Sequence, residues 1–144
     1  MSEFALHRMV QGSLKEVVML KVKDIMTKTV VTVSQDMNVR EICSLLIKHR
    51  LSGLPVTDKK GNLVGFVSER DIITSVSLND FLEKKAKDIM TKKVFSVKEN
   101  MSTDQASRIF TEKPFRYVPV TRGTKVVGII SRKDVIDRLL GQYY

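Results

Sequence analysis

Two short Ser-x-x-Asp motifs are the residues of this sequence whose types and spacing best support chemistry. Ser68 precedes Asp71 by three positions, and Ser131 precedes Asp134 by the same interval. At a helix N-terminus this spacing places a hydroxyl and a carboxylate beside unpaired backbone N–H groups, which favour anions. A serine followed three residues later by an acid is also typical of a helix N-cap. The residues alone therefore leave both a ligand site and a cap open.

Catalytic and metal chemistry have little support in this sequence. It holds one cysteine, Cys43, and two histidines, His7 and His49, which cannot build a typical structural zinc site. We find no paired-carboxylate acid/base set, no nucleophile with a base and no Gly-x-x-x-x-Gly-Lys-Ser/Thr phosphate loop. Cys43 lies on the apolar side of a predicted helix, where a buried structural thiol is expected. We therefore expect a binding protein rather than an enzyme, with no cofactor and no metal.

The composition is that of a globular protein in a reducing compartment. Apolar residues make up 42% of the 144 residues and charged residues 28%, which argues against wholesale disorder. A single cysteine excludes an intrachain disulfide framework. No apolar run approaches the roughly 18 residues that span a bilayer, and residues 1–20 lack the pattern of a secretion signal. We expect a cytoplasmic protein with no membrane partner.

An internal repeat positions the two motifs. Residues 23–28, KDIMTK, recur as residues 87–92 at an offset of 64, and residues 64–68 correspond to 127–131 at an offset of 63. A unit of about 55 residues buries too little surface to be secure alone, so we expect the two copies to share one core. The expected organisation is an N-terminal segment with a helix, a first repeat, a polar linker, a second repeat and a tail: 1–20, 21–76, 77–84, 85–140 and 141–144.

Each repeat is predicted to run strand, helix, strand, strand, helix. β-branched residues favour strands, and apolar residues at helical spacing behind a capping residue favour helices. In the first copy these patterns predict strand 29–33, helix 38–50, strands 54–57 and 63–68, and helix 68–76. The second copy repeats this order, with a capping box from Ser102 to Gln105 and with Ser131 as the cap of the last helix.

These segments resemble a tandem pair of cystathionine β-synthase (CBS) domains. The resemblance rests on the repeated Asp-Ile-Met-Thr, on Gly53–Val56 and on Gly65–Asp71, and it extends over about residues 21–140. It implies an α/β (α+β) fold in which two pseudo-twofold-related β-α-β-β-α repeats share one core. It also implies two related clefts between the repeats.

The resemblance further implies a regulatory ligand sensor. CBS pairs bind adenosine compounds in their clefts, so the ligands to consider are AMP, ADP, ATP and S-adenosylmethionine. The family's ribose motif corresponds here to Ser68, Asp71, Ser131 and Asp134. A carboxylate can accept hydrogen bonds from both ribose hydroxyls, and its charge strengthens them. The residues that the resemblance places around the adenine are Met26, Thr27, Val30, Leu51, Ser52, Gly53, Leu54, Met90, Thr91, Val94, Phe115, Tyr117 and Val118.

Within this scheme each cleft draws on both repeats. The expected groupings are Asp71 with Thr91 and residues 115–118, and Asp134 with Thr27 and residues 51–54. For the two methionines, core filling is the alternative role, because methionine adapts to irregular gaps.

Basic side chains near the two motifs would bind the phosphates of a nucleotide. They are Lys28, Arg70, Lys92, Arg116, Arg132 and Lys133. The chain carries a net charge of +9, of which residues 1–84 contribute +2 (12 basic, 10 acidic) and residues 85–144 contribute +7 (13 basic, 6 acidic). The second repeat is therefore the better place for a phosphorylated ligand. Arg116 there replaces Ser52 of the first repeat, so we expect unequal affinities of the two sites.

Two other functions stay open at this point. The basic charge permits nucleic-acid binding through phosphates, although aromatic residues are only 6%, too few for a base-stacking platform. A ligand-free interaction module is the other alternative, since CBS pairs usually dimerise through helical faces. We expect a homodimer that signals to an unidentified partner protein by a conformational shift.

Overall fold

The computed structural model describes residues 20–141, which form two compact units. The first unit contains residues 20–30, 96–123 and 127–141, and the second contains residues 31–95 and 124–126. The helix predicted within residues 1–20 and the tail beyond residue 141 lie outside the described residues. In the described part, no helix is long and apolar enough to cross a membrane.

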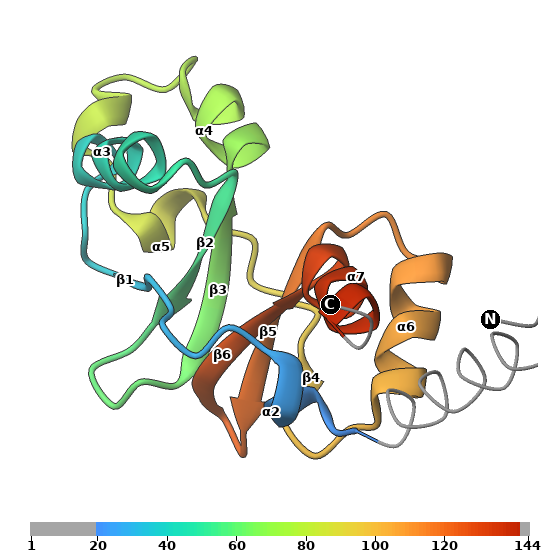
Figure 1. The fold of residues 1–144 in the computed structure, drawn as a ribbon. Coiled ribbons are helices and arrows are strands. Elements are labelled where there is room, and N and C mark those ends of the chain that lie inside the picture. Colours follow the sequence, from blue (N-terminus) through green and yellow to red (C-terminus); the bar gives the residue numbers. More distant parts are fainter. Residues whose placement is uncertain (1–19, 142–144) are drawn as a thin grey trace, which may run out of the picture. The chain divides into compact units, whose positions relative to one another are not determined.

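The second unit is built on a three-stranded sheet with the strand order β1-β2-β3 (Figure 1). β1 runs parallel to β2, and β2 runs antiparallel to β3. The elements of this unit are β1 (Val33–Ser34), α3 (Val39–His49), β2 (Gly53–Thr57), β3 (Leu63–Ser68), α4 (Glu69–Ser75), the 3₁₀-helix η1 (Phe81–Glu83) and α5 (Ala86–Ile89).

The first unit repeats this architecture around a second sheet of order β4-β5-β6, in which β4 is parallel to β5. The expected mixed class, with strand, helix, strand, strand and helix in each repeat, is confirmed. The elements of this unit are α2 (Val22–Ile25), β4 (Val97–Lys98), α6 (Thr103–Glu112), β5 (Tyr117–Arg122), β6 (Lys125–Ser131) and α7 (Arg132–Gly141), where the first two residues of β6 group with the second unit.

Capping residues explain where the longer helices begin. Asn38 accepts a hydrogen bond from the Glu41 N–H (2.9 Å) at the start of α3, and Arg50 ends that helix in the left-handed conformation (φ 54°). Ser102 and Gln105 form the predicted capping box of α6. Each cap satisfies N–H groups that have no partner inside the helix. The predicted limits of the first long helix are therefore confirmed to within a residue.

The strand predicted over residues 29–33 is wrong for most of its length. Only Val33 enters β1, and residues 28–32 have no regular secondary structure. β-branched residues favour a strand only where a partner edge is available. Here Thr27 bridges Ile129 in β6, whereas Val33 pairs with Val56 in β2, so residues 28–32 connect one unit to the other.

Each compact unit combines the sheet of one repeat with a short helix from the other repeat. The first unit joins α2 of the first repeat to the sheet of the second, and the second unit joins α5 of the second repeat to the sheet of the first. Thr27, which follows α2, exchanges backbone hydrogen bonds with Ile129 of β6 (2.8 and 3.0 Å). Thr91, which follows α5, does the same with Phe66 of β3 (2.9 Å in both directions). The two compact units therefore do not coincide with the two contiguous repeats.

The buried residues form two clusters, and each contains residues of both repeats. The two repeats therefore share core residues, as expected, but in two cores rather than in one. The short helix of each repeat contributes a buried residue to the core around the other repeat's sheet. Val22 of α2 and Ala86 of α5 are both 0% exposed. The clusters are Val22, Val97, Ala106, Phe110, Val118, Val120 and Ile130 in the first unit, and Val33, Ile42, Leu46, Leu54, Val56, Val67 and Ala86 in the second.

Candidate functional site

In the second unit, Ser68 and Asp71 form a capping box at the start of α4. Asp71 Oδ2 accepts hydrogen bonds from the Ser68 N–H (2.9 Å) and hydroxyl (3.0 Å), and Ser68 Oγ accepts one from the Asp71 N–H (3.1 Å). β3 ends at Ser68, so the last residue of the strand is also the N-cap of α4. The cap interpretation is confirmed, and the cap orients the Asp71 carboxylate.

Asp71 also accepts a hydrogen bond from Thr91. The Thr91 hydroxyl oxygen lies 3.2 Å from Asp71 Oδ1 and 3.4 Å from Oδ2. Thr91 is held there by its backbone bridge to Phe66 in β3, the strand that precedes α4. The expected grouping of Asp71 with Thr91 is therefore present as a direct contact.

The first unit has a matching arrangement. Asp134 Oδ2 accepts hydrogen bonds from the Ser131 N–H (2.8 Å) and hydroxyl (3.0 Å), and Thr27 donates its hydroxyl to Asp134 Oδ1 (3.3 Å). The expected grouping of Asp134 with Thr27 is likewise present. We refer to Thr91, Ser68 and Asp71, and to Thr27, Ser131 and Asp134, as the two Thr–Ser–Asp clusters.

One carboxylate oxygen in each cluster has spare acceptor capacity. The cap occupies Oδ2, whereas Oδ1 accepts from one threonine hydroxyl over 3.2 Å in Asp71 and 3.3 Å in Asp134. Both distances are long for an O–H···O hydrogen bond. An ionised carboxylate offers about four acceptor positions. Each cluster can therefore accept a hydroxyl from a ligand without breaking the helix cap.

The segments before the two Pro-Val steps lie beside the cluster of their own repeat. The Glu69 N–H donates to the Ser52 carbonyl (2.9 Å), and the Arg132 N–H donates to the Arg116 carbonyl (3.2 Å). In the second unit the antiparallel pairing explains this, because it sets the start of β2 against the end of β3. The expected crosswise grouping of these segments with the clusters joins residues of different units, and it stays a prediction.

The residues expected around the adenine, apart from the two threonines, are buried or half-buried. Met26 packs against the core cluster of the first unit, and Met90 packs against that of the second. The two methionines lie directly on Gly128 and Gly65, where an added Cβ would collide with their side chains. The core-filling role of the methionines is therefore confirmed, and their contact with a ligand stays a prediction.

The basic residues expected to bind phosphate are all exposed. Arg132 is already engaged, because its Nη2 donates to the carbonyls of Phe110 (3.3 Å) and Lys113 (3.4 Å) and so caps the end of α6. Lys28 lines a pocket together with Met26, which was expected near the adenine, and with five residues that were not among the expected site residues. For Arg70, Lys92, Arg116 and Lys133 the phosphate role stays a prediction.

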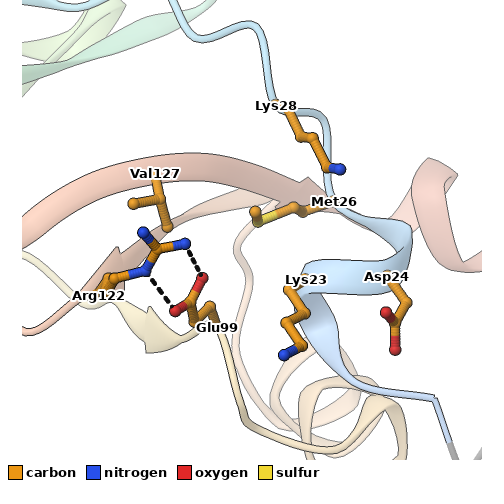
Figure 2. A pocket seen from close by; sticks show the side chains of 7 residues that line it. All are labelled: Lys23, Asp24, Met26, Lys28, Glu99, Arg122 and Val127. Carbon is orange, nitrogen blue, oxygen red and sulfur yellow. Dashed lines mark hydrogen bonds and ion pairs between the residues drawn. The ribbon is translucent and has the colours of Figure 1, made fainter.

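The pocket beside Lys28 has a volume of about 460 Å³ and lies within the first unit (Figure 2). Arg122 binds Glu99 there through two parallel hydrogen bonds, Nε to Oε1 (2.6 Å) and Nη2 to Oε2 (3.1 Å). This hydrogen bonding lowers the pKa of Glu99 and raises that of Arg122 from their ordinary values. The lining residues are Lys23, Asp24, Met26, Lys28, Glu99, Arg122 and Val127.

The sequence patterns described above do not single out Glu99 or Arg122. A comparison of the repeats could have found them, because Glu99 replaces Gln35 and Arg122 replaces Asp58 at corresponding positions. A neutral–acidic pair thus becomes an acidic–basic pair, which is what a new salt bridge requires.

Cys43 lies beside an apolar pocket of about 270 Å³ between α3 and α4, next to Leu46 and Ile72. Burial raises the pKa of the Cys43 thiol, which disfavours the nucleophilic thiolate. The expected structural role of this cysteine agrees with that environment. Among the described residues, no group of three or more His, Cys, Asp and Glu side chains could hold a metal ion.

Comparison with known families gives two matches to one family model, described as CBS domain, over residues 22–78 and 86–141. A curated relative is inosine-5′-monophosphate dehydrogenase from Methanocaldococcus jannaschii, which is 32% identical over 119 residues. That alignment covers 82% of this chain and 23% of the enzyme. The similarity to the enzyme is therefore confined to less than a quarter of its length.

Two solved structures are similar along almost their whole length. CBSX2 in complex with AMP has a TM-score of 0.78 at 28% identity, covering 86% of this chain and 98% of that one. The CBS domain pair of protein MJ0100, in complex with 5′-methylthioadenosine and S-adenosyl-L-methionine, has a TM-score of 0.71 at 31% identity, covering 88% and 99%. Both structures contain adenosine compounds.

Proposed function

The chain belongs to the CBS domain family, and on that premise we propose that it is a regulatory module that binds an adenosine-containing ligand. AMP, ADP and ATP are the first candidates, with S-adenosylmethionine as the alternative. The observation that carries the proposal is the duplicated Thr–Ser–Asp cluster, whose carboxylate is held by a helix cap on one oxygen. The neighbours in complex with AMP, 5′-methylthioadenosine and S-adenosyl-L-methionine support this ligand class.

The chemistry of the cluster suits a ribose. A ribose presents two adjacent hydroxyls, and an ionised carboxylate accepts strong hydrogen bonds from such donors. The threonine hydroxyl beside each carboxylate can turn to accept or donate as the ligand requires. The net charge of +7 in residues 85–144 favours a phosphorylated ligand over S-adenosylmethionine, whose sulfonium is cationic.

The proposed activity is binding without turnover. The alignment with inosine-5′-monophosphate dehydrogenase covers 23% of that enzyme, so the activity of the whole enzyme does not follow from it. Burial raises the pKa of Cys43, the one thiol of the chain, which argues against a nucleophile there. A single cysteine also supports the reducing, cytoplasmic location that we propose.

Regulation requires that the ligand bind one arrangement of the protein better than another. Typical coupling free energies between sites are about 1–3 kcal/mol, which limits the shift that the ligand can cause. We propose that a homodimer relays this shift to a partner protein. The apolar face of α3 and α4 supports self-association, because Ile47 is 79% exposed and Ile73 is 71% exposed.

Thermal unfolding with AMP, ADP, ATP or S-adenosylmethionine tests the proposal. A ligand at 100 times its Kd adds about 2.7 kcal/mol of stability, which raises the Tm of a chain of this size by several degrees. We expect such a rise with at least one ligand, and we expect Asp71→Asn or Asp134→Asn to abolish most of it. Asp88→Asn is the matched control, since Asp88 accepts from the Lys85 N–H (2.9 Å) and caps α5 outside the clusters.

Two results would contradict the proposal. One is an unchanged Tm with all four ligands, and the other is an equal loss of the ligand effect in Asp88→Asn. In the first case a salt titration with duplex DNA and RNA tests the nucleic-acid alternative, because binding through phosphates weakens steeply with salt.

A further inference from the structure

The pocket at Arg122 lies at the opposite end of the β5–β6 hairpin from the Thr–Ser–Asp cluster of the first unit. Arg122 is the last residue of β5, next to the turn at Gly123, which has a positive φ of 63°. Ser131 is the last residue of β6, at the open end of the hairpin, where the Arg116 carbonyl also lies. The pocket is therefore distinct from the candidate ribose site.

The extended segment after α2 directs successive side chains either to the Thr–Ser–Asp cluster or to the pocket. Thr27 points to Asp134, whereas its neighbours Met26 and Lys28 line the pocket. Successive side chains of an extended segment point to opposite sides, and Thr27 is bridged to β6 like a strand residue. A ligand in the pocket would therefore contact Met26 and Lys28 without contacting the Thr27 hydroxyl.

The Arg122 guanidinium is held in place at the pocket. Glu99, which is 9% exposed, fixes it by the two hydrogen bonds described above. Glu99 is itself fixed by its backbone, because its N–H donates to the Thr121 carbonyl (3.1 Å) and its carbonyl accepts from the Lys23 N–H (3.0 Å). The Arg122 side chain nevertheless stays 72% exposed. It therefore offers an oriented cation to a ligand at little further cost in side-chain entropy.

The other charges of the pocket favour an anion. Lys23 and Lys28 come from α2 and the segment after it, and both line the pocket that contains the Arg122–Glu99 pair (Figure 2). The two acidic residues already have partners, since Glu99 binds Arg122 and Asp24 accepts from the Lys21 N–H (2.9 Å). Three cations against two carboxylates give a local charge of +1. Met26 and Val127 add apolar surface.

The other repeat lacks this combination. Asp58, which corresponds to Arg122, accepts hydrogen bonds from the Lys60 N–H, the Asn62 N–H and the Asn62 side chain (2.9, 2.9 and 3.0 Å) and so closes its own turn. Lys87, which corresponds to Lys23, forms an ion pair with Asp36 (3.4 Å). The first unit alone therefore combines a fixed guanidinium with two lysines at this position among the described residues.

From these observations we propose that the pocket binds a small organic oxyanion, meaning a phosphate or carboxylate attached to an apolar group. Arg122, Lys23 and Lys28 bind the charged group, and Met26 and Val127 contact the apolar part. The pocket shares Met26 and Lys28 with the residues expected around the adenosine ligand, but it does not include the Thr–Ser–Asp cluster of Thr27, Ser131 and Asp134, and it gives the module a second input.

Methyl NMR of protein labelled at methionine tests this site, with the Met26 signal assigned by Met26→Leu. The full-length protein is titrated with phenyl phosphate, benzoate and inorganic phosphate. We expect a saturable shift of the Met26 signal with phenyl phosphate or benzoate, at lower concentration than with inorganic phosphate. Whichever of phenyl phosphate and benzoate binds with the lower Kd shows whether the pocket prefers a phosphate or a carboxylate.

Variants separate binding at this pocket from general charge effects. Lys28→Gln and Arg122→Lys are each expected to weaken binding about tenfold, the scale of one charge-assisted hydrogen bond. Lys87→Gln, at the position of the second unit that corresponds to Lys23, also removes one lysine charge and should leave the Kd unchanged. Unshifted signals of the other methionines show that each variant is folded. The proposal is overturned if no ligand saturates the Met26 shift, or if Lys87→Gln weakens binding as much as Lys28→Gln.

Discussion

Asp71 performs two tasks with two different oxygen atoms. Oδ2 accepts the N–H and hydroxyl of Ser68 and so begins α4, while Oδ1 meets the Thr91 hydroxyl. A carboxylate that caps a helix is also pre-oriented, because its rotamer is fixed before any ligand arrives. The cap and the proposed ligand contact are therefore compatible at one residue, and Asp134 shows the same division.

A side chain at Gly65 is expected to destabilise the second unit. A Cβ at this position would lie 2.8 Å from Met90 Cγ and 3.1 Å from the Thr91 carbonyl oxygen, which is fixed by its hydrogen bond from the Phe66 N–H. Gly65→Ala should therefore lower the free energy of unfolding by about 1–3 kcal/mol, the usual cost of overpacking. Urea unfolding measures this change.

A double-mutant cycle provides the control for Gly65→Ala. In a Met90→Ala background the same substitution should cost less, because part of the collision is removed. Equal costs in both backgrounds would show that Met90 is not the obstacle.

The Glu99–Arg122 pair should make stability depend on pH in the acid range. Because the folded pKa of Glu99 lies below its ordinary value, the pair's contribution is complete above the ordinary carboxyl pKa of about 4.3. It is lost as the pH falls through the folded pKa. Urea unfolding at several pH values between 7 and 3 should show a larger loss for the wild type than for Glu99→Gln. Parallel curves would exclude this role.

At the scale of elements, α3 and α4 present apolar residues that no described residue covers fully. We expect Ile47→Glu and Ile73→Glu to weaken self-association while changing the free energy of unfolding by about 0.5 kcal/mol or less, as for other exposed positions. Sedimentation measures the association. Lys48→Glu is the control on α3, because it changes charge without removing apolar surface. A wild type that sediments as a monomer would remove the basis for a dimer.

The elements also show what the sequence can predict. The helix from Val39 was predictable because its cap and its apolar spacing are local, and the Thr–Asp groupings were predictable through the family resemblance. The extent of the strand predicted over residues 29–33 could not be predicted, because it depends on which residues pair with the edge of a sheet. The four-residue helices α2 and α5 are too short to be stable by local propensity, and packing against the other repeat explains their formation.

At the scale of the whole molecule, the exchange of α2 and α5 makes the two halves of the chain dependent on each other. A fragment of residues 31–84 lacks Ala86, which is 0% exposed in the second core, whereas residues 31–95 include it. We expect cooperative thermal unfolding by circular dichroism only for the longer fragment. Ala86→Asp in that fragment should abolish the transition, since it buries a charge in the core. A cooperative transition in residues 31–84 would contradict this dependence.

The bridge between Thr27 and Ile129 also has a consequence for how the protein is made. Residues near Thr27 leave the ribosome early, but β6 emerges only after about 100 more residues, which takes roughly 5–20 s at ordinary rates of synthesis. The second unit needs little beyond residue 95 and can fold during that interval. The second unit can therefore form first, whereas Thr27 gains its partner in β6 only after nearly the whole chain has been made.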